Sequence, residues 1–277
     1  MRKNVLRRAT AVLLSAAAIA LAAPAVTASA DGVQAAFLQS GQRLNPGEKL
    51  VSGGSALVMQ WDGNLVVRLV NDQGDLGPEL WASGTYNNWA AYAYMQPDGN
   101  FVIYRQNGGP DQGGAIWHTG SWGHPGSYIS LYEGSLRGNG FSWETQSGMA
   151  IAVSNGGWHP ESVFNSGRGV APGYFLRSNS VWLVNQRDGN MVLYRKRDGA
   201  ALWSTGTWNQ PASTFYAADV YGGSQMYLRV PNSTRMTWSV SFRGQTNVQG
   251  KLQDDGNFVI YSQGGQALWS TGTYGNW

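Results

Sequence analysis

The stretch NQRDGNMVLYR, residues 185–195, sets an Asp-Gly pair between a polar flank and an apolar run that ends in tyrosine. The same pattern returns as MQWDGNLVVR from Met59, MQPDGNFVIYR from Met95 and LQDDGNFVIYS from Leu252. An Asp-Gly pair between apolar strands is typical of a β-hairpin. These four stretches, each followed by a tryptophan, predict an all-β chain of short antiparallel sheets.

The chain is also duplicated internally. The 27 residues from Ser40 align without a gap on those from Ser166 and are identical at 13 positions. Two faded copies of the hairpin, SLYEGSLRG from Ser130 and DVYGGSQMYL from Asp219, complete three units in each half. We therefore expect two tandem domains, residues 31–157 and 158–277, each with three small sheets packed around a common axis.

A tryptophan follows each of the six hairpins. Because a small sheet cannot bury its face alone, we expect these side chains to form an aromatic centre, three to a domain, rather than to stack on a ligand. They are Trp81, Trp117, Trp143, Trp203, Trp238 and Trp269. Five less regular tryptophans are candidates for surface platforms or for packing between the domains: Trp61, Trp89, Trp122, Trp158 and Trp208.

The first thirty residues have the pattern of a secretory signal peptide. Four basic residues precede an alanine-rich apolar run and the small-residue box Ala28-Ser29-Ala30. The apolar run is too short to span a bilayer. We expect a secreted, extracellular protein that starts at Asp31, by an export route that the sequence leaves open. With no cysteine, this protein must be held by its core rather than by disulfides.

Removal of that leader changes the charge. The whole chain has 19 Lys+Arg and 16 Asp+Glu, and four of the cations but no acid precede Asp31, so the remaining 247 residues (277 − 30) carry 15 against 16, a net charge of −1. No basic stripe remains that would favour nucleic acid or an anionic membrane, and we expect no membrane insertion.

Catalysis is also disfavoured by the sequence. His118, His124 and His159 show no metal-ligand spacing, and the recurrent carboxylates occur singly rather than as an acid–base pair. We therefore expect that the protein is not an enzyme and that it uses no metal and no cofactor.

Hairpin geometry divides the motif into two faces. A three-residue loop that ends in glycine places Gln253 opposite Asn257. Because strand side chains alternate, Val259 and Tyr261 share the face of Asn257. The opposite, core-facing side takes Asn185 and the pairs Leu65 and Val67, Phe101 and Ile103, Met191 and Leu193, Phe258 and Ile260. Turn chemistry explains Asp-Gly-Asn but not the fixed Gln, Val and Tyr, so the outer face is a candidate site for a hydroxyl-rich ligand.

The motif Gln-x-Asp-x-Asn-x-Val-x-Tyr resembles that of the bulb-type (monocot, GNA-like) mannose-binding lectins, through both domains. The resemblance implies a β-prism II fold, with three four-stranded sheets around a pseudo-threefold axis and a central tryptophan cluster. It also implies metal-independent, multivalent binding of D-mannose-type sugars. The carbohydrate-binding residues that it assigns are Gln96, Asp98, Asn100, Val102 and Tyr104; Gln186, Asp188, Asn190, Val192 and Tyr194; and Gln253, Asp255, Asn257, Val259 and Tyr261.

By the same resemblance, each Asp and Asn contacts the axial 2-hydroxyl of mannose, each Gln the 3-hydroxyl, each Tyr the 4-hydroxyl, and each Val the ring carbons. The first copy is doubtful, because Arg68 stands where tyrosine belongs; this site is either lost or shifted toward a different or acidic sugar. Its matching residues are Gln60, Asp62, Asn64 and Val66. The faded copies near Tyr132 and Tyr221 lack Asp and Asn, so we expect no binding there.

Two such domains in one chain are also similar to the tandem lectin-like bacteriocins, which bind bacterial surface polysaccharide and kill related bacteria. The sequence leaves both interpretations open, a plain lectin for mannose-containing glycans and a toxin that binds bacterial polysaccharide. It also leaves open the oligomeric state and an exchange of terminal strands between the domains.

Overall fold

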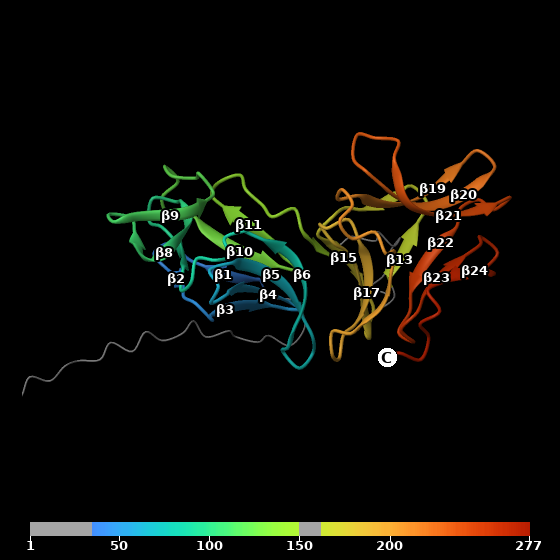
Figure 1. Ribbon diagram of the computed structural model, residues 1–277, viewed down its shortest axis with the longest axis horizontal. Coiled ribbons are helices and arrows are strands. Elements are labelled where there is room, and N and C mark those ends of the chain that lie inside the picture. Colours follow the sequence, from blue (N-terminus) through green and yellow to red (C-terminus); the bar gives the residue numbers. More distant parts are fainter. Residues whose placement is uncertain (1–34, 150–161) are drawn as a thin grey trace, which may run out of the picture.

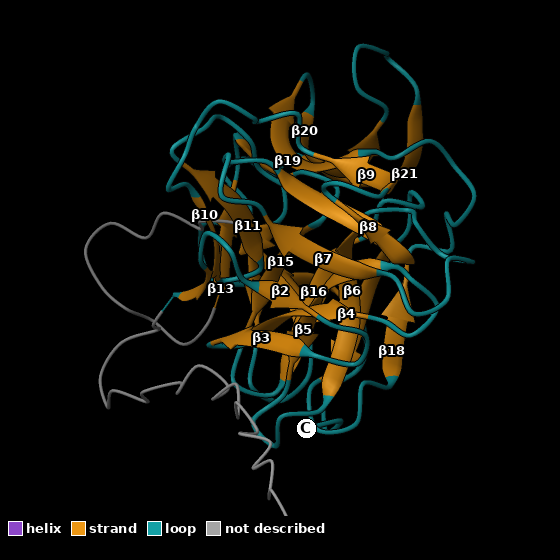
Figure 2. Cartoon of the chain, turned by 90° about the vertical axis from the view of Figure 1, so that its left-hand side faces the viewer, coloured by secondary structure: helices purple, strands orange, loops and turns teal. Residues whose placement is uncertain are grey.

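The protein forms two bodies in chain order, seen at the left and the right of Figure 1. The computed structural model describes residues 35–149 and 162–277. Within these ranges every regular element is a β-strand, as Figure 2 shows. The predicted leader and the predicted boundary between residues 157 and 158 lie outside the described residues.

Three antiparallel sheets make up the first body, one for each hairpin unit. The first sheet has the strand order β3 (Lys49–Ser52), β4 (Ser55–Met59), β5 (Leu65–Val70) and β6 (Leu76–Ala82). The second sheet runs β2 (Arg43–Leu44), β7 (Tyr92–Met95), β8 (Phe101–Gly109) and β9 (Gly113–His118). The third sheet consists of β1 (Ala36–Leu38), β10 (Tyr128–Tyr132) and β11 (Ser135–Asn139).

The second body repeats this arrangement. Its first sheet has the order β12 (Gly148–Met149), β15 (Tyr174–Arg177), β16 (Val181–Asn185), β17 (Met191–Arg195) and β18 (Ala201–Ser204). Its second sheet runs β14 (Arg168–Val170), β19 (Thr214–Val220), β20 (Gly223–Arg229) and β21 (Met236–Arg243). Its third sheet runs β13 (Ser162–Asn165), β22 (Gln249–Leu252), β23 (Phe258–Tyr261) and β24 (Ala267–Ser270).

In both bodies the first stretch of chain supplies one strand to each of the three sheets before the hairpins begin, and this strand is at the edge of its sheet except for β15, which lies between β12 and β16. Strands β1, β2 and β3 pair with β10, β7 and β4. Strands β13, β14 and β15 pair in the same way with β22, β19 and β16. Each body is therefore closed by its own early residues, which ties the three units together across a long sequence separation.

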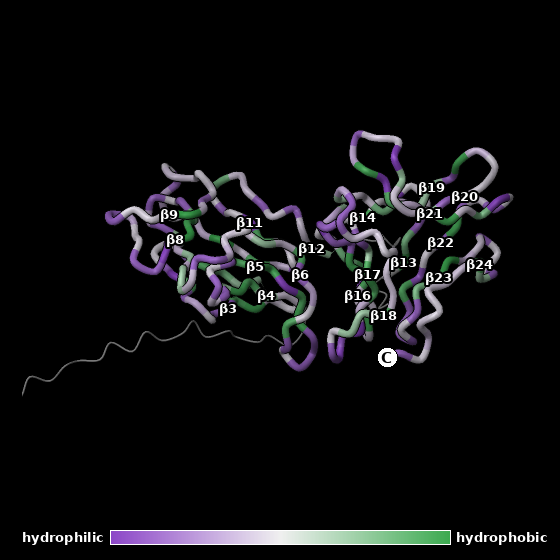
Figure 3. Tube along the Cα trace, viewed as in Figure 1, coloured by the Kyte–Doolittle hydropathy of each residue, from purple (hydrophilic) through white to green (hydrophobic). Residues whose placement is uncertain are grey.

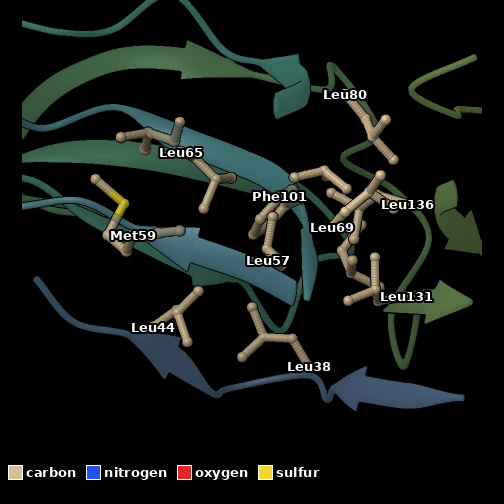
Figure 4. Packing of buried hydrophobic residues seen from close by; sticks show 14 of the residues in the cluster. Leu38, Leu44, Leu57, Met59, Leu65, Leu69, Leu80, Phe101, Leu131 and Leu136 are labelled. Carbon is tan, nitrogen blue, oxygen red and sulfur yellow. The ribbon is translucent and has the colours of Figure 1, made fainter. Parts of the chain in front are cut away.

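The predicted core faces are confirmed. The paired residues named above on β5, β8, β17 and β23 are all buried, and they fall into one large cluster in each body. Figure 3 shows hydrophobic segments along the inner strands and hydrophilic ones in the connecting loops. Figure 4 shows Leu57, Leu65, Phe101 and Leu136 turned toward one another in the first cluster. Asn185 is also buried as predicted, and its Nδ2 donates to the carbonyls of Val170 (2.7 Å) and Ser213 (2.8 Å).

The two tryptophan centres are confirmed as well. Trp81, Trp117 and Trp143 meet edge-to-face with ring centroids 5.6–6.1 Å apart. The second body repeats this triangle at 5.7–6.0 Å with Trp203, Trp238 and Trp269. Edge-to-face pairs at this spacing each add about 0.5–1.5 kcal/mol beyond the burial of their area. The three sheets thus surround a shared aromatic axis, which is the β-prism II arrangement expected from the sequence.

Of the two positions expected for the less regular tryptophans, the surface and the packing between the domains, the structure shows the surface. Four of them, Trp61, Trp89, Trp122 and Trp208, are 60–71% exposed and lie on the surface; Trp158 lies outside the described residues. The contact between the bodies instead uses Trp182, which the sequence pattern did not single out. Trp182 is 2% exposed and belongs, with Phe175 and Val184, to the core cluster of the first body.

The junction between the two bodies also contains polar contacts and a shared strand. Strand β12 pairs in parallel with β15, through Gly148–Tyr174 and Met149–Phe175. Arg177 forms an ion pair with the buried Glu133 at 3.0 Å. Arg187 donates to the carbonyl oxygens of Leu80, Thr145 and Gln146 at 3.2, 2.8 and 2.9 Å. Burial lowers the pKa of Arg187, which its interface position explains.

Candidate functional site

The four Asp-Gly hairpins share one turn geometry, and it is the predicted one. In each, the N–H of Gln donates to the carbonyl of Asn at 2.8–2.9 Å, so the two residues lie opposite each other across a three-residue loop. The loop glycines, Gly63, Gly99, Gly189 and Gly256, have φ between +86° and +96°. A Cβ on any of them would also meet the backbone of the following loop at 2.0–2.9 Å. Only glycine satisfies both conditions.

The motif aspartate is held by its own turn. In all four copies its Oδ1 accepts the backbone N–H of the motif asparagine at 2.9 Å. This bond fixes the carboxylate beside the asparagine side chain. No protein partner is found for Oδ2 of Asp98, Asp188 or Asp255 within the described part of the chain, so that oxygen remains an acceptor for a ligand.

The motif asparagine is oriented by two hydroxyl residues that follow the core tryptophan, one through its hydroxyl and the other through its backbone N–H. Asn190 Oδ1 accepts from Thr205 Oγ1 at 3.0 Å and from the backbone N–H of Thr207 at 3.1 Å. Because a backbone N–H can only donate, the atom that faces it must be the carbonyl oxygen, and Nδ2 points away. Among residues 35–149 and 162–277, Nδ2 of Asn190 has no acceptor.

The same pair of hydroxyl residues supports the asparagine in every copy. Ser83 and Thr85 serve Asn64, Thr119 and Ser121 serve Asn100, and Thr271 and Thr273 serve Asn257. The second hydroxyl of each pair also donates to the carbonyl of the turn glycine at 2.7–2.9 Å. The sequence contained the signal for these positioning residues, a Ser or Thr two and four places after the core tryptophan of each unit with an Asp-Gly-Asn turn, but its role was not predicted.

The glutamine and tyrosine of each complete motif are bonded to each other. Nε2 donates to the phenol oxygen in Gln96–Tyr104, Gln186–Tyr194 and Gln253–Tyr261 at 3.1, 2.9 and 3.0 Å. The amide Oε1 remains an acceptor, and the phenol keeps its own proton to donate. Burial raises the pKa of Tyr104 and of Tyr194, so both phenols stay protonated at neutral pH.

The residues of the last motif line one pocket. Gln253, Asp255, Asn257, Val259 and Tyr261 share a surface pocket of 560 Å³ with the neighbouring strand β24. The pocket therefore offers one carboxylate oxygen, an amide donor and an amide acceptor, a phenol and an apolar wall. Such a set matches the donors, acceptors and C–H surface of a sugar.

The three complete sites are not equally open. Tyr104 is only 5% exposed and packs against Tyr92 at 5.8 Å between ring centroids, whereas Tyr194 and Tyr261 are half-buried. The guanidinium of Arg43 lies over the Tyr92 ring at 4.5 Å and over the Tyr94 ring at 5.0 Å. The site of Gln96 thus has a deeper tyrosine, which no feature of its motif indicated.

The site of Gln186 lies next to the junction between the two bodies. Tyr194 stands opposite the buried Trp182 in the strand register. Arg187, between Gln186 and Asp188 in the motif, makes the three hydrogen bonds to the first body described above. The candidate site and the junction between the two bodies therefore share one loop.

The first copy keeps the turn but not the phenol. Arg68, in place of tyrosine, donates to the carbonyl of Gly77 at 3.0 Å and lies 3.9 Å from the carboxylate of Glu79. Asp62 and Asn64 keep the bonds seen in the complete copies. This site retains the Asp–Asn pair and lacks the Gln–Tyr pair.

The faded copies differ in loop length as well as in residue type. Tyr132 pairs with Ser135 and Val220 with Gly223, so each hairpin closes with a two-residue turn instead of a three-residue loop. Neither turn has an Asp–Asn pair. In the first body, the turn residue Glu133 instead pairs with Arg177 at the junction.

No cluster of three or more His, Cys, Asp or Glu side chains among residues 35–149 and 162–277 could hold a metal ion. No helix in those ranges is long and apolar enough to cross a membrane.

No family model and no curated protein matches the chain. Solved structures do match it. The two-domain fetuin-binding agglutinin of Scilla campanulata is 23% identical over 88% of this chain and 97% of its own, with a TM-score of 0.33. The mannose-specific agglutinin of snowdrop (Galanthus nivalis) bulbs, complexed with methyl-α-D-mannoside, is 29% identical over 44% and 99%, with a TM-score of 0.32. The Marasmius oreades lectin is 25% identical over 42% and 93%, with a TM-score of 0.37. The chain is thus similar to several lectins at low TM-scores, and the candidate site rests on the chain's own geometry.

Proposed function

We propose that this protein is a lectin that binds D-mannose-type sugars at three sites, without a metal, a cofactor or a catalytic step. The sites are centred on Asn100, Asn190 and Asn257. The supporting observation is the repeated asparagine whose Oδ1 accepts two hydrogen bonds from the protein while its Nδ2 has no acceptor among the described residues.

A sugar hydroxyl both donates and accepts a hydrogen bond. Beside each asparagine, Oδ2 of the aspartate can accept the hydroxyl proton while Nδ2 of the asparagine donates to the hydroxyl oxygen. The Gln–Tyr pair offers the same combination one step along the strand, with Oε1 as acceptor and the phenol as donor. The Asp–Asn pair and the Gln–Tyr pair are neighbours on one face of the hairpin, with the valine between the asparagine and the tyrosine. Together they can bind consecutive hydroxyls of one pyranose ring.

The resemblance described above assigns these two positions to the axial 2-hydroxyl and to the 3- and 4-hydroxyls of mannose. An Asp–Asn pair fixed by the turn cannot follow a hydroxyl that moves from axial to equatorial. We therefore expect methyl-α-D-mannoside to bind more tightly than methyl-α-D-glucoside, which differs in that hydroxyl.

Several weak sites act together in the proposed function. A shallow site for one monosaccharide gives modest affinity, because few atoms are buried. Linking sites in one chain makes the second contact with the same glycan intramolecular and raises the apparent affinity. The natural partners are mannose-containing glycans or a bacterial surface polysaccharide with the same sugar.

A glycan array probed with the wild-type protein and with the variant Asn100→Asp/Asn190→Asp/Asn257→Asp tests the proposal. The change keeps the side-chain shape but removes the free donor and sets a second carboxylate beside the aspartate. We expect the variant to lose mannoside binding by at least about fivefold per site, because a lost hydrogen bond costs about 1 kcal/mol or more.

The matched control is Asn232→Asp, in an exposed loop between β20 and β21. It makes the same chemical change away from the sites and should bind as wild type. The proposal is wrong if the wild-type protein binds no glycan, or if the triple variant and the control bind alike.

We also propose that the protein is secreted, with residues 1–30 removed. The supporting observation is the basic, apolar and small-residue order of that segment. Amino-terminal sequencing of the protein recovered from the medium should begin at Asp31, and a cell-retained product with an intact leader would contradict the proposal.

A further inference from the structure

An exposed aromatic residue stands at a fixed place beside each intact turn. Five positions after the core tryptophan of each unit with an Asp-Gly-Asn turn, the chain places Tyr86, Trp122, Trp208 and Tyr274. Their side chains are 60%, 60%, 63% and 73% exposed. Large aromatic side chains exposed to this extent gain little from burial, so the core does not explain them.

The aromatic residue accompanies the polar set rather than the fold. The two faded units keep the core tryptophan and the sheet, but the same position holds Gly148 in one and Arg243 in the other. Neither unit has the Asp–Asn pair. The fold therefore forms without an aromatic residue at this position, and the residue type changes where the polar site is absent.

The loop that carries the aromatic residue is fixed to the polar turn. The residue before it is the second hydroxyl residue, which binds both the asparagine Oδ1 and the glycine carbonyl. Backbone N–H groups of Asn88, His124 and Gly275 further along these loops donate to the carbonyls of Asp62, Asp98 and Asp255 at 3.0, 3.0 and 2.8 Å. The aromatic ring is thus anchored within a few residues of the Asp–Asn pair on both sides.

In the last unit the consequence is visible in the pocket itself. Tyr274 lines the same 560 Å³ pocket as Gln253, Asp255, Asn257, Val259 and Tyr261. The next residue, Gly275, donates its N–H to the carbonyl of Asp255 at 2.8 Å, which ties Tyr274 to the turn that carries the Asp–Asn pair. A pyranose held by the polar set would have its neighbour in a glycan chain within reach of this ring.

We propose that Tyr274, Trp208 and Trp122, beside the three complete sites, are specificity residues that stack on the C–H face of the sugar next to the recognised mannose, so that the sites prefer oligosaccharides to monosaccharides. This inference rests on the proposed function. Aromatic rings offer a large rigid apolar face at low entropic cost, which suits the flat C–H surface of a pyranose.

The test isolates one site. In the background Asn100→Asp/Asn190→Asp, which leaves the site of Asn257, dissociation constants for methyl-α-D-mannoside and for a mannotriose are measured by NMR titration. The variants compared are Tyr274→Ala, Tyr274→Phe and the control Tyr221→Ala, which removes a fully exposed tyrosine in a faded unit.

We expect Tyr274→Ala to raise the ratio of the mannotriose constant to the mannoside constant about three- to tenfold, the effect of one aromatic contact. Tyr274→Phe, which keeps the ring, and Tyr221→Ala should leave this ratio as in the background protein. The inference is overturned if Tyr274→Ala leaves the ratio unchanged, or if it alters only self-association in sedimentation, which would make the ring a contact between copies. If the unmutated protein binds neither sugar, the proposed function itself fails.

Discussion

Arg68 and Glu79 occupy the two positions that hold a Tyr–Ala pair in every complete copy. Across the strand pair, Arg68 aligns with Glu79, whereas Tyr104 aligns with Ala115, Tyr194 with Ala201 and Tyr261 with Ala267. The ion pair therefore replaces a phenol and a small neighbour together. We predict that the double change Arg68→Tyr/Glu79→Ala creates a fourth complete site.

The expected gain in sugar affinity depends on the neighbours of residue 68. On the other side, residue 68 aligns with Ala56, which leaves room for a phenol ring. A tyrosine at this register would accept from Gln60 Nε2, as in the other copies, so that the phenol donates one hydrogen bond to the sugar and the oriented Oε1 of Gln60 accepts a second. Two hydrogen bonds of about 1 kcal/mol each correspond to roughly a 30-fold lower Kd at this site.

The cost in stability is small by the same reasoning. The Arg68–Glu79 contact is 3.9 Å long and partly exposed, and such pairs contribute about 0–1 kcal/mol. Loss of the Arg68–Gly77 hydrogen bond adds about 1–2 kcal/mol. A body held by a buried core and a tryptophan triad should tolerate this loss and remain folded.

The assay uses the background Asn100→Asp/Asn190→Asp/Asn257→Asp, in which the three complete sites are disabled. Binding of methyl-α-D-mannoside is followed by NMR titration, with Glu79→Ala alone as the control. We expect the double change to restore binding and the control to leave the background nearly silent. A folded double variant, shown by an unchanged near-ultraviolet circular dichroism spectrum, that still fails to bind would refute the reasoning.

Three further outcomes follow from the geometry. Trp238→Ala removes one corner of the second aromatic triangle and should destabilise that body by about 3–5 kcal/mol in denaturant unfolding, and a loss below about 1 kcal/mol would contradict the role of the triad. Arg187→Ala removes three hydrogen bonds between the bodies and should split a single thermal transition into two, or widen the gap between two, which calorimetry would detect; an unchanged trace would show that the bodies dock without it. Burial raises the pKa of Tyr104 and Tyr194 above the usual 10.0, so the unfolded chain ionises first and stability should be intact below pH 10 and fall as the pH rises above it. Phenolate absorbance of the folded protein should show these two tyrosines titrating late, and titration of all tyrosines near pH 10 would contradict the shift.

Much of the fold could be predicted because it depends on local patterns. The Asp-Gly turn fixes the register of a hairpin, and alternation then decides that Phe258 and Ile260 face inward and Val259 outward. The repetition of one tryptophan per unit predicted the aromatic triangles, since each sheet needs a partner for its buried face. These inferences need no knowledge of residues that are distant in sequence.

The contacts between units and between bodies could not be predicted in this way. The alternation of side chains along its strand places Trp182 on the outward face of the sheet. It is buried because the other body covers it. Arg187 occupies a variable position of the motif, so its three bonds across the junction leave no periodic trace. The depth of Tyr104 also depends on Arg43, which comes from an early strand and lies over the ring of Tyr92, the partner of Tyr104 across its own hairpin.

The arrangement of three sheets around an aromatic axis determines how one molecule can contact several glycan chains. The outer faces of the sheets look in different directions, so the sites of Asn100, Asn190 and Asn257 cannot all lie on one flat surface. A protein with three sites that face in different directions can bind three separate glycan chains at once. It can therefore serve as a branch point in a continuous network. In a solution of long mannose-bearing polymers, a lectin with the three proposed sites should therefore act as a cross-link that turns a liquid into a gel.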